Sequence, residues 1–428
     1  MQRLSTRDAG FAAAFAAVVS DRRESDADVA RDVAAILADV RVRGDEALAD
    51  YTVRFDGHDL GEDWRISAET CREAFDALEP TLRAALELAG QRITAYHQAQ
   101  LPEDRDYVDA AGVRLGAKWR GVDGAGLYVP GGRAAYPSSL LMNAIPAKVA
   151  GVGRLVVTTP TPKGAINPLV LAAAHLAGVD EVWRVGGAQA IAALAYGTKR
   201  IAPVDVITGP GNAWVAEAKR QLFGVVGIDM VAGPSEILVI ADGANDPQWI
   251  AADLLSQAEH DPAAQAILIT DDAAFADAVE AAVQSEIALL PTAAVARASW
   301  DAHGVIIVVS SLDEAPALAN ALAAEHVEIA CDDPEALFAG IRHAGSVFLG
   351  RHTPEAIGDY VAGPNHVLPT GRRARFASGL SVLDFMKRTS FIAVSEASIG
   401  AIGPAAVALA EAEGLAAHAR SIELRLGI

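Results

Sequence analysis

From about residue 120 onward, short apolar runs alternate with segments whose apolar residues recur at helical spacing. The runs RLVVTT (154–159), EVWRVGG (181–187) and DVIT (205–208) are rich in β-branched residues, and helices are predicted to begin at Asn167 and near Asn212. Apolar strands separated by capped helices are typical of a parallel sheet with helices on both faces. This stretch therefore predicts a doubly wound, Rossmann-like β/α unit.

The same alternation repeats in the next part of the chain, where helices are predicted from residue 247, from about 273 and across 313–325. The apolar runs between them are ILVIA (237–241), AILIT (266–270), GVIIVV (304–309), VEIA (327–330) and SVFLG (346–350). Two doubly wound units side by side form a crevice, and ligands in such folds bind at the carboxyl ends of the strands. The fold class is therefore predicted to be α/β with two parallel-sheet units.

The two ends of the chain lack this alternation. The first 110 or so residues have a helical and charged pattern, with strand character only near YTVRFDG (51–57), and residues 9–19 are predicted to be a packed helix rather than a signal peptide. The tail 411–426 has a helical pattern with a break at Gly414. The predicted organisation is a helical N-terminal region (1–119), a first β/α domain (120–236), a second β/α domain (237–375) and a helical tail (376–428).

Composition narrows the class of protein. The chain has 428 residues, of which 52% are hydrophobic, and a formal net charge of −20, which disfavours nucleic acid or an anionic membrane as the main partner. The two cysteines, Cys71 and Cys331, have no metal-site or redox spacing, and no apolar run approaches the length of a membrane span. We therefore expect a cytoplasmic protein.

One predicted helix carries polar residues on its apolar face. In the helix expected between Asp246 and Pro262, Gln257 lies seven residues after Ile250 and three after Leu254, so it continues their stripe, and His260 follows three residues later. Both side chains are expected to point inward, where polar groups need partners. Those partners are either hydrogen-bonding groups of a neighbouring loop or a bound metal or ligand.

Glycine-rich loops follow several predicted strands. None of them is the dinucleotide-binding fingerprint, since Trp214 stands where the third glycine would be, but glycine allows a tight turn and close approach of a ligand to the backbone. Each loop alone is explained by turn formation, and all of them together favour a binding crevice. The loops are YVPGG (128–132), VGGAQA (185–190), ITGPGN (207–212) and VAGPSE (231–236).

Other candidate residues each have a structural alternative. Glu325 and His326 stand between a predicted helix and a strand, where His326 could cap the helix or, in a crevice, act as a general base beside Glu325. Asp359, on a short predicted helix, could be a surface residue, and His366 is interpreted as loop structure. In the tail, Glu413 and His418 flank the break at Gly414 and, taken alone, are typical of solvated positions.

Together these segments resemble the histidinol dehydrogenase family, from about residue 120 to the end of the chain. The segments that carry the resemblance include GLYVPGGRAAYPSSLLMNAIPAKVAGV, GGAQAIAALAYGT, GPGNAWVAEAKRQLFG, DMVAGPSEILVIAD, DLLSQAEHDP, EHVEI, GDYVAGPNHVLPTG, LSVLDFMKRTSF and EGLAAHARSIELR. The resemblance implies oxidation of L-histidinol to L-histidine through L-histidinal, the last step of histidine biosynthesis, with NAD and one Zn²⁺ per site.

The resemblance also implies roles for individual residues. The implied zinc ligands are Gln257, His260, Asp359 and, from the partner subunit of a homodimer with shared sites, His418. Glu325 and His326 are the implied catalytic pair, and substrate is contacted by Ser235, His326, Glu413 and the four ligands. The implied NAD-contacting residues are Tyr128, Gln189 and Asn212. Arg133, Arg372 and Arg373 are expected in loops that tolerate substitution.

Two other functions stay open at this point. A related zinc- and NAD-dependent dehydrogenase of another diol, such as a sulfonated propanediol, would share the metal and NAD residues, and Glu413 favours histidinol because a carboxylate suits its cationic amine. A non-catalytic metal- or nucleotide-binding protein would be expected to lack Glu325 or His326, and both are present.

Overall fold

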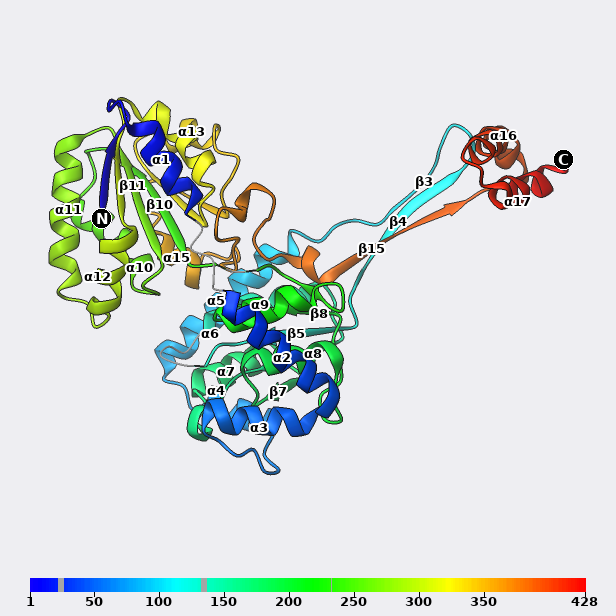
Figure 1. Ribbon diagram of the computed structural model, residues 1–428, viewed down its shortest axis with the longest axis horizontal. Coiled ribbons are helices and arrows are strands. Elements are labelled where there is room, and N and C mark those ends of the chain that lie inside the picture. The colour runs from blue at the N-terminus through cyan, green and yellow to red at the C-terminus, as the bar shows by residue number, and fades with distance from the viewer. Residues whose placement is uncertain (22–26, 132–136, 232) are drawn as a thin grey trace.

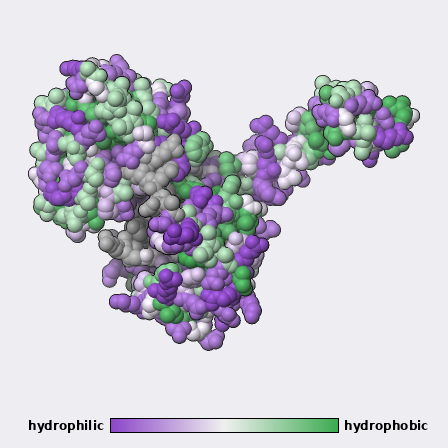
Figure 2. All heavy atoms as spheres, in the orientation of Figure 1, coloured by the Kyte–Doolittle hydropathy of each residue, from purple (hydrophilic) through white to green (hydrophobic). Residues whose placement is uncertain are grey.

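The computed structural model describes residues 1–21, 27–131, 137–231 and 233–428 of the chain. Two β/α units lie side by side, and an arm carries the C-terminal helices well away from both (Figure 1). On the side of the two units that faces the viewer in Figure 2, hydrophilic and hydrophobic residues are interspersed. Among the described residues, no helix combines the length and the apolar character that crossing a membrane requires.

The first unit is built on a six-stranded sheet with the order β2-β7-β6-β5-β8-β9, in which only the edge strand β2 is antiparallel to its neighbour. Its strands are β2 (Arg65–Ile66), β5 (Gly124–Tyr128), β6 (Arg154–Thr158), β7 (Glu181–Trp183), β8 (Val206–Thr208) and β9 (Gly227–Ile228). One face packs against α2 (Ala27–Arg43), α3 (Asp45–Asp56), α8 (Gly187–Tyr196) and α9 (Ala213–Leu222). The other packs against α4 (Ala68–Asp76), α5 (Pro80–Gln98), α6 (Pro137–Val149) and α7 (Pro168–Leu176).

The second unit is built on a six-stranded sheet with the order β1-β12-β11-β10-β13-β14, in which all neighbours are parallel. Its strands are β1 (Gln2–Ser5), β10 (Glu236–Ala241), β11 (Gln265–Thr270), β12 (Val305–Val308), β13 (His326–Ala330) and β14 (Ser346–Leu349). One face packs against α10 (Pro247–Ala258), α11 (Ala273–Ile287) and α12 (Ala293–His303), and the other against α1 (Phe11–Ser20), α13 (Ala315–Leu322) and α14 (Pro334–Phe338). The short helix α15 (Glu355–Tyr360) follows β14.

Strand side chains alternate between the two cores of each unit. Val239 packs with the α10 side of the second sheet, whereas Leu238 and Ile240 pack with the α1 side. Successive residues of a strand point to opposite faces, so a strand covered on both faces must be apolar throughout. This is why the apolar runs of the sequence correspond to the central strands.

The arm is a separate antiparallel sheet with the order β15-β4-β3. It consists of β3 (Arg105–Val108), β4 (Arg114–Gly121) and β15 (Met386–Ala393), and it leads to α16 (Glu396–Ala412) and α17 (Ala416–Leu426). The short 3₁₀ turns of the chain are Pro162–Gly164, Leu312–Glu314, Arg373–Arg375 and Val382–Phe385. Gly414 has φ +75 between the two tail helices, which confirms the predicted break.

The predicted fold class is confirmed, with several differences at the ends of the chain, among them that β3 and most of β4 lie in the predicted helical N-terminal region. Residues 51–56 of the segment YTVRFDG lie in α3, and Gly57 caps the helix. Leu48 and Thr52 are both buried one helical turn apart, so packing overrides the strand propensity of the segment. Residues 2–5 form an edge strand of the second sheet, and α1 packs beside it, although both fall in the predicted N-terminal region. The predicted helical tail contains β15, whose mostly exposed side chains give no apolar pattern.

Candidate active site

A cleft of about 890 Å³ lies between the two units and is lined by residues of both. From the first unit come loops that follow strands, such as Gly209–Asn212 after β8. From the second unit come Glu325 and His326, which stand at the amino end of β13. The cleft therefore lies at the carboxyl edge of the first sheet, as the sequence predicts for a ligand site, whereas in the second unit it lies at the amino edge of the sheet.

Gln257 and His260 both line this cleft, at the carboxyl end of α10. Gln257 is 2% exposed, as the stripe through Ile250 and Leu254 predicts. His260 also lies at the cleft, but its side chain is exposed, so the expectation that both side chains are shielded from water holds for Gln257 alone. The reason is that α10 ends at Ala258 rather than just before Pro262, so His260 lies in a turn and no longer continues the helical stripe.

The main chain of one residue holds both members of the predicted catalytic pair. The backbone N–H of Glu236, the first residue of β10, donates to Oε2 of Glu325 at 3.0 Å. The backbone oxygen of Glu236 lies 3.1 Å from Nδ1 of His326. Because a carbonyl oxygen can only accept, Nδ1 of the neutral ring carries the proton, and Nε2 is the basic position.

Burial shifts the pKa of both side chains in directions that suit a general base. It lowers the pKa of His326, against the opposing effect of the Glu355 carboxylate, so the ring is neutral at pH 7. Burial also raises the pKa of Glu325 well above its ordinary value, and the charges of Glu236, Asp359 and Glu355 act in the same direction. A carboxylate with a high pKa is a stronger base than an ordinary one, which suits removal of a proton from water.

Glu355 is a site residue that the sequence analysis missed. It is 3% exposed, its Oε1 lies 3.5 Å from Nε2 of His326, and its Oε2 accepts a hydrogen bond from Ser256 at 3.0 Å. Glu355 stands four residues before Asp359 on α15, so the two carboxylates share one helix face. That spacing is visible in the sequence, but the contacts of Glu355 with His326 and Ser256 are made only in the folded chain.

The residues of the cleft fit a zinc ion. One ligand atom each from His326, Glu355 and Asp359 lies within 4.8 Å of the others, which is a group that could hold a metal. Oε1 of the buried Gln257 has no hydrogen-bond partner among the described residues, and a bound cation would satisfy it. Imidazole nitrogen and carboxylate oxygen are ordinary zinc ligands. The group shares only Asp359 with the implied ligand set.

His366, which was interpreted as loop structure, also lines the cleft. Its Nδ1 lies 3.0 Å from the backbone oxygen of Asp359, and its Nε2 lies 3.2 Å from the hydroxyl of Ser139 on α6. Burial lowers the pKa of His366 to about 4. The ring is therefore a neutral wall of the site that ties the loop after α15 to the first unit.

Two more carboxyl groups, of which Glu328 is buried and Asp253 partly buried, lie close to Glu355. Glu328 on β13 is 1% exposed and hydrogen-bonds to Asp253 on α10. Burial raises the pKa of Glu328 to about 9, and the charge of Asp253 adds to this effect. Two carboxylates in contact cannot both ionise at low cost, so Glu328 retains a proton that it shares with Asp253.

The residues implied for NAD lie at the carboxyl edge of the first sheet. Asn212 lines the cleft, and its Oδ1 accepts from the backbone of Trp214 and Val215 at the start of α9. Tyr128 is buried at the end of β5, where its hydroxyl accepts from the backbone of Gly187 at 3.1 Å. Gln189, on α8, is also buried.

A buried ion pair fixes the glycine loop of this edge. Lys219 and Asp229 form the pair, and their side chains are 2% and 1% exposed. Asp229 accepts from the backbone N–H of Gly209, and Lys219 donates to the backbone oxygen of Gly209, both at 2.9 Å. Gly209 has φ +116, and a Cβ there would lie 2.2 Å from the backbone oxygen of Tyr128, so only glycine fits.

The remaining predicted site residues divide between the cleft and the tail. Ser235 lines the cleft. Glu413 and His418 are exposed on the tail helices, and the arm holds these helices far from the cleft of the same chain (Figure 1). The structure therefore brings together Ser235, Gln257, His260, Glu325, His326 and Asp359 in the cleft, and leaves Glu413 and His418 outside it.

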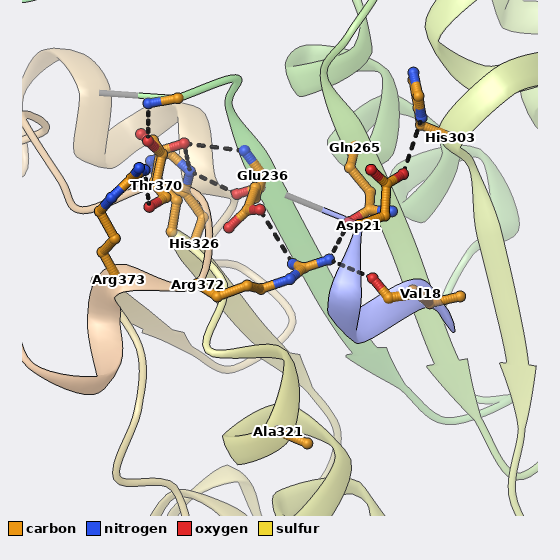
Figure 3. Close-up of polar contacts among 12 residues, drawn as sticks. Val18, Asp21, Glu236, Gln265, His303, Ala321, His326, Thr370, Arg372 and Arg373 are labelled. Carbon is orange, nitrogen blue, oxygen red and sulfur yellow. Dashed lines mark hydrogen bonds and ion pairs between the residues drawn. The ribbon is translucent and has the colours of Figure 1, made fainter. Parts of the chain in front are cut away.

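The expectation that Arg372 lies in a loop that tolerates substitution is wrong, because its side chain is buried. It is 2% exposed and forms an ion pair with the side chain of Glu236 (Figure 3). The sequence pattern did not predict this, because two adjacent arginines in a predicted loop between apolar segments are typical of a surface. Arg133, with the same expectation, lies outside the described residues, as do Gly132 and Ala232 of the predicted glycine-rich loops.

Comparison with known proteins gives one consistent result. The model of the family described as histidinol dehydrogenase matches residues 19–426. The histidinol dehydrogenase of Zymomonas mobilis subsp. mobilis is 62% identical over 99% of both chains, and that of Rhodospirillum rubrum is 64% identical over 99% of this chain and 98% of its own. The crystal structure of histidinol dehydrogenase from Elizabethkingia anophelis, 35% identical, superimposes with a TM-score of 0.94 and covers 100% of this chain and 98% of its own.

The protonated Glu328 generates a prediction for stability. Its folded-state pKa lies above its unfolded-state value, so between about pH 4.3 and about pH 9 the unfolded chain releases a proton that the folded chain retains. The free energy of unfolding therefore falls as pH rises through this window, by up to about 1.4 kcal/mol per pH unit. We expect Glu328→Gln to flatten that dependence in urea unfolding at a series of pH values. Glu335→Gln, at an exposed position of α14, is the control, and equal slopes for both variants would contradict the prediction.

Proposed function

Because the chain belongs to the histidinol dehydrogenase family, we propose that histidinol is oxidised in the cleft between the two units, with His326 and Glu325 as the catalytic pair. The chain is an oxidoreductase of histidine biosynthesis whose function is histidinol dehydrogenation. The observation that carries the assignment of residues is the shared support of Glu325 and His326 by the main chain of Glu236. This support fixes the neutral imidazole of His326, with its Nε2 unprotonated, directly beside the buried carboxyl group of Glu325.

In the first step His326 removes a proton from oxygen. The Nε2 atom of the neutral ring accepts the proton of the substrate hydroxyl, while a hydride leaves the carbon that bears this hydroxyl. The product is the aldehyde. The low pKa of His326 keeps the ring in its basic form at neutral pH. NAD, when bound, supplies the hydride acceptor in this step and in the next one.

In the second step the aldehyde is hydrated before it is oxidised, because a second hydride can leave only from a tetrahedral carbon that carries hydrogen. Glu325 is the base that removes a proton from the attacking water, and its raised pKa makes it effective in that role. As the hydrate forms, His326 returns its first proton to the aldehyde oxygen, and the neutral ring then accepts the hydroxyl proton of the hydrate while the second hydride leaves. Retention of the aldehyde in the cleft between the steps protects a reactive intermediate.

The other walls of the cleft bind and orient the reactants. Tyr128, Gln189 and Asn212 are proposed to contact NAD at the carboxyl edge of the first sheet, where the Gly209 backbone is held in place. Gln257, His260 and Asp359 are proposed to hold zinc, and Ser235 to contact histidinol. The zinc ion would bind the amino and imidazole nitrogens of histidinol and thereby orient its carbinol toward His326.

The protein is proposed to be a homodimer in which the tail of one subunit completes the site of the other. Glu413 and His418 are exposed on helices that the arm holds away from the cleft of the same chain. The arm and tail also expose large apolar side chains, including Ile392, Leu409 and Leu424. Apolar residues on an extended arm are typical of a surface that is covered by a partner, so His418 is proposed as the partner's zinc ligand.

The two steps should respond differently to substitution of the catalytic pair. His326→Asn should abolish oxidation of both histidinol and histidinal, since both steps remove a proton from oxygen. Glu325→Gln should lower histidinal oxidation by about 10² to 10⁴, the usual contribution of general acid–base catalysis, and histidinol-to-histidinal oxidation much less. Single-turnover rates with each substrate measure the two effects, with His175→Asn and Glu335→Gln, at exposed positions, as controls. Equal losses in both steps for Glu325→Gln would contradict the role of Glu325.

Removal of zinc should abolish activity and leave the fold intact. The two β/α units have apolar cores of their own, unlike a small metal-dependent domain. We expect a chelator-treated sample to lose activity with an unchanged far-ultraviolet circular dichroism spectrum. Asp359→Asn and His260→Asn should each lower the zinc content per chain measured by atomic absorption, whereas His352→Asn, an exposed control, should not. Full zinc content in both ligand variants would refute the ligand assignment.

Shared sites predict complementation between two inactive variants. In a mixed dimer of His418→Ala and His326→Asn, one site carries both substitutions and the other carries neither. Random mixing of equal amounts should therefore restore activity to about one quarter of wild type, by the two-fold symmetry of the dimer. The measurement is activity after subunit exchange, with exchange itself followed by a mass tag on one variant. Complete exchange without recovered activity would show that His418 acts in its own chain.

A further inference from the structure

Arg372 lies behind the catalytic pair, in the interior of the second unit. Its guanidinium donates to Oε1 of Glu236 at 3.1 Å, to Oε1 of Gln265 at 2.7 Å and to the backbone oxygen of Val18 at 3.0 Å (Figure 3). These three acceptors belong to β10, β11 and the last turn of α1. A buried cation is stable only when such partners surround it, so Arg372 joins three separate segments at one point.

The backbone of Arg372 is also unusual. Its φ is +66, a left-handed conformation that a residue with a side chain rarely adopts. A disfavoured backbone conformation persists only where the surrounding structure imposes it. Here the three hydrogen bonds of the guanidinium hold the loop between Thr370 and the turn Arg373–Arg375 in place.

Glu236 connects Arg372 to the catalytic pair. Its side chain is the carboxylate partner of Arg372, and its main chain contacts both Glu325 and His326. All four residues are nearly inaccessible to solvent. A shift of Glu236 would therefore move the hydrogen bond to Oε2 of Glu325 and the one to Nδ1 of His326 together.

Charge gives Arg372 a second effect on the same residues. The Glu236 carboxylate is buried near Glu325, and its charge adds to the burial that raises the pKa of Glu325. Without Arg372, the negative charge of Glu236 would be buried without its cation, which disfavours the present position of the side chain. The ion pair thus holds Glu236 in the geometry on which both catalytic side chains depend.

We infer that Arg372 is a positioning residue for the oxidation, which acts on Glu325 and His326 through Glu236 and ties the N-terminal helix α1 to the active site. The inference rests on the proposed catalytic roles of Glu325 and His326. Arg372 touches neither reacting atoms nor substrate in this arrangement. Its contribution is to kcat, since catalytic groups must be held within a fraction of an ångström and a misplacement of about 1 Å can cost about a hundredfold in rate.

The test compares kcat and KM for histidinol and for histidinal in Arg372→Met with those of a matched control. Arg154→Met is that control, because Arg154 in the first unit likewise pairs with a carboxylate, Glu181, and donates to two backbone oxygens, at the amino end of β6. Arg372→Met should lower kcat for both substrates by about ten- to a hundredfold with little change in KM. Arg154→Met should lower the melting temperature with kcat of the folded enzyme unchanged.

A double variant separates the ion pair from simple loss of packing. Arg372→Met leaves the charge of Glu236 without its partner, and Glu236→Gln removes that charge, so the double variant should regain part of the kcat lost in Arg372→Met. If Arg372→Met fails to fold, Arg372→Lys, which keeps the charge and loses the fork of donors, is measured in the same way. A purely structural residue would give no such recovery in kcat.

The outcomes distinguish this inference from the proposed function. If Glu325→Gln and His326→Asn retain both activities, the proposed catalytic roles are wrong, whatever Arg372 does. If those variants are impaired and kcat of folded Arg372→Met, or of Arg372→Lys in its place, equals that of wild type, the catalytic roles stand and the positioning role of Arg372 is overturned. A fall in kcat for both substrates, absent in Arg154→Met and partly reversed by Glu236→Gln, supports the positioning role.

Discussion

The active site depends on the main chain of a single residue, Glu236, at the amino end of β10. Its N–H and its carbonyl group contact the side chains of Glu325 and His326 at the start of the neighbouring strand β13. The parallel register places Ile237 opposite His326, so Glu236 lies next to the start of β13. The sheet thereby fixes which nitrogen of His326 is basic before any ligand binds.

The location of the site follows from the way the two units face each other. The first unit offers loops at the carboxyl ends of its strands, where glycine brings the backbone close to a ligand, and the second offers the amino ends of β10 and β13. Helix α10 returns the chain to this same amino edge and presents Gln257 there. A cofactor held by the first unit, as proposed, would therefore lie within reach of the proposed catalytic pair of the second.

The second unit buries several carboxyl groups close to the site, and removing these groups from water lowers the free energy of unfolding. Glu325, Glu328, Glu355 and Asp359 lie near one another, and burial raises the pKa of three of them, Glu325, Glu328 and Asp359. Arg372 neutralises the nearby Glu236, and Glu328 retains a proton. Desolvated carboxylates strengthen the hold on cations and the basicity of Glu325, so the arrangement favours function over stability.

The sequence by itself determined the two β/α series, the break at Gly414 and the inward position of Gln257, because each of these depends on local spacing of apolar residues, glycine or capping groups. It did not determine that β1 joins the second sheet. Leu4 is the only buried apolar residue of that strand, so its place depends mainly on backbone pairing with β12, which the sequence pattern does not show. Nor did it reveal Glu355, His366 or Arg372, whose importance comes from what other segments bring next to them. Tertiary structure alone decided which edge of each sheet meets the cleft, because that depends on how two separately folded units pack together.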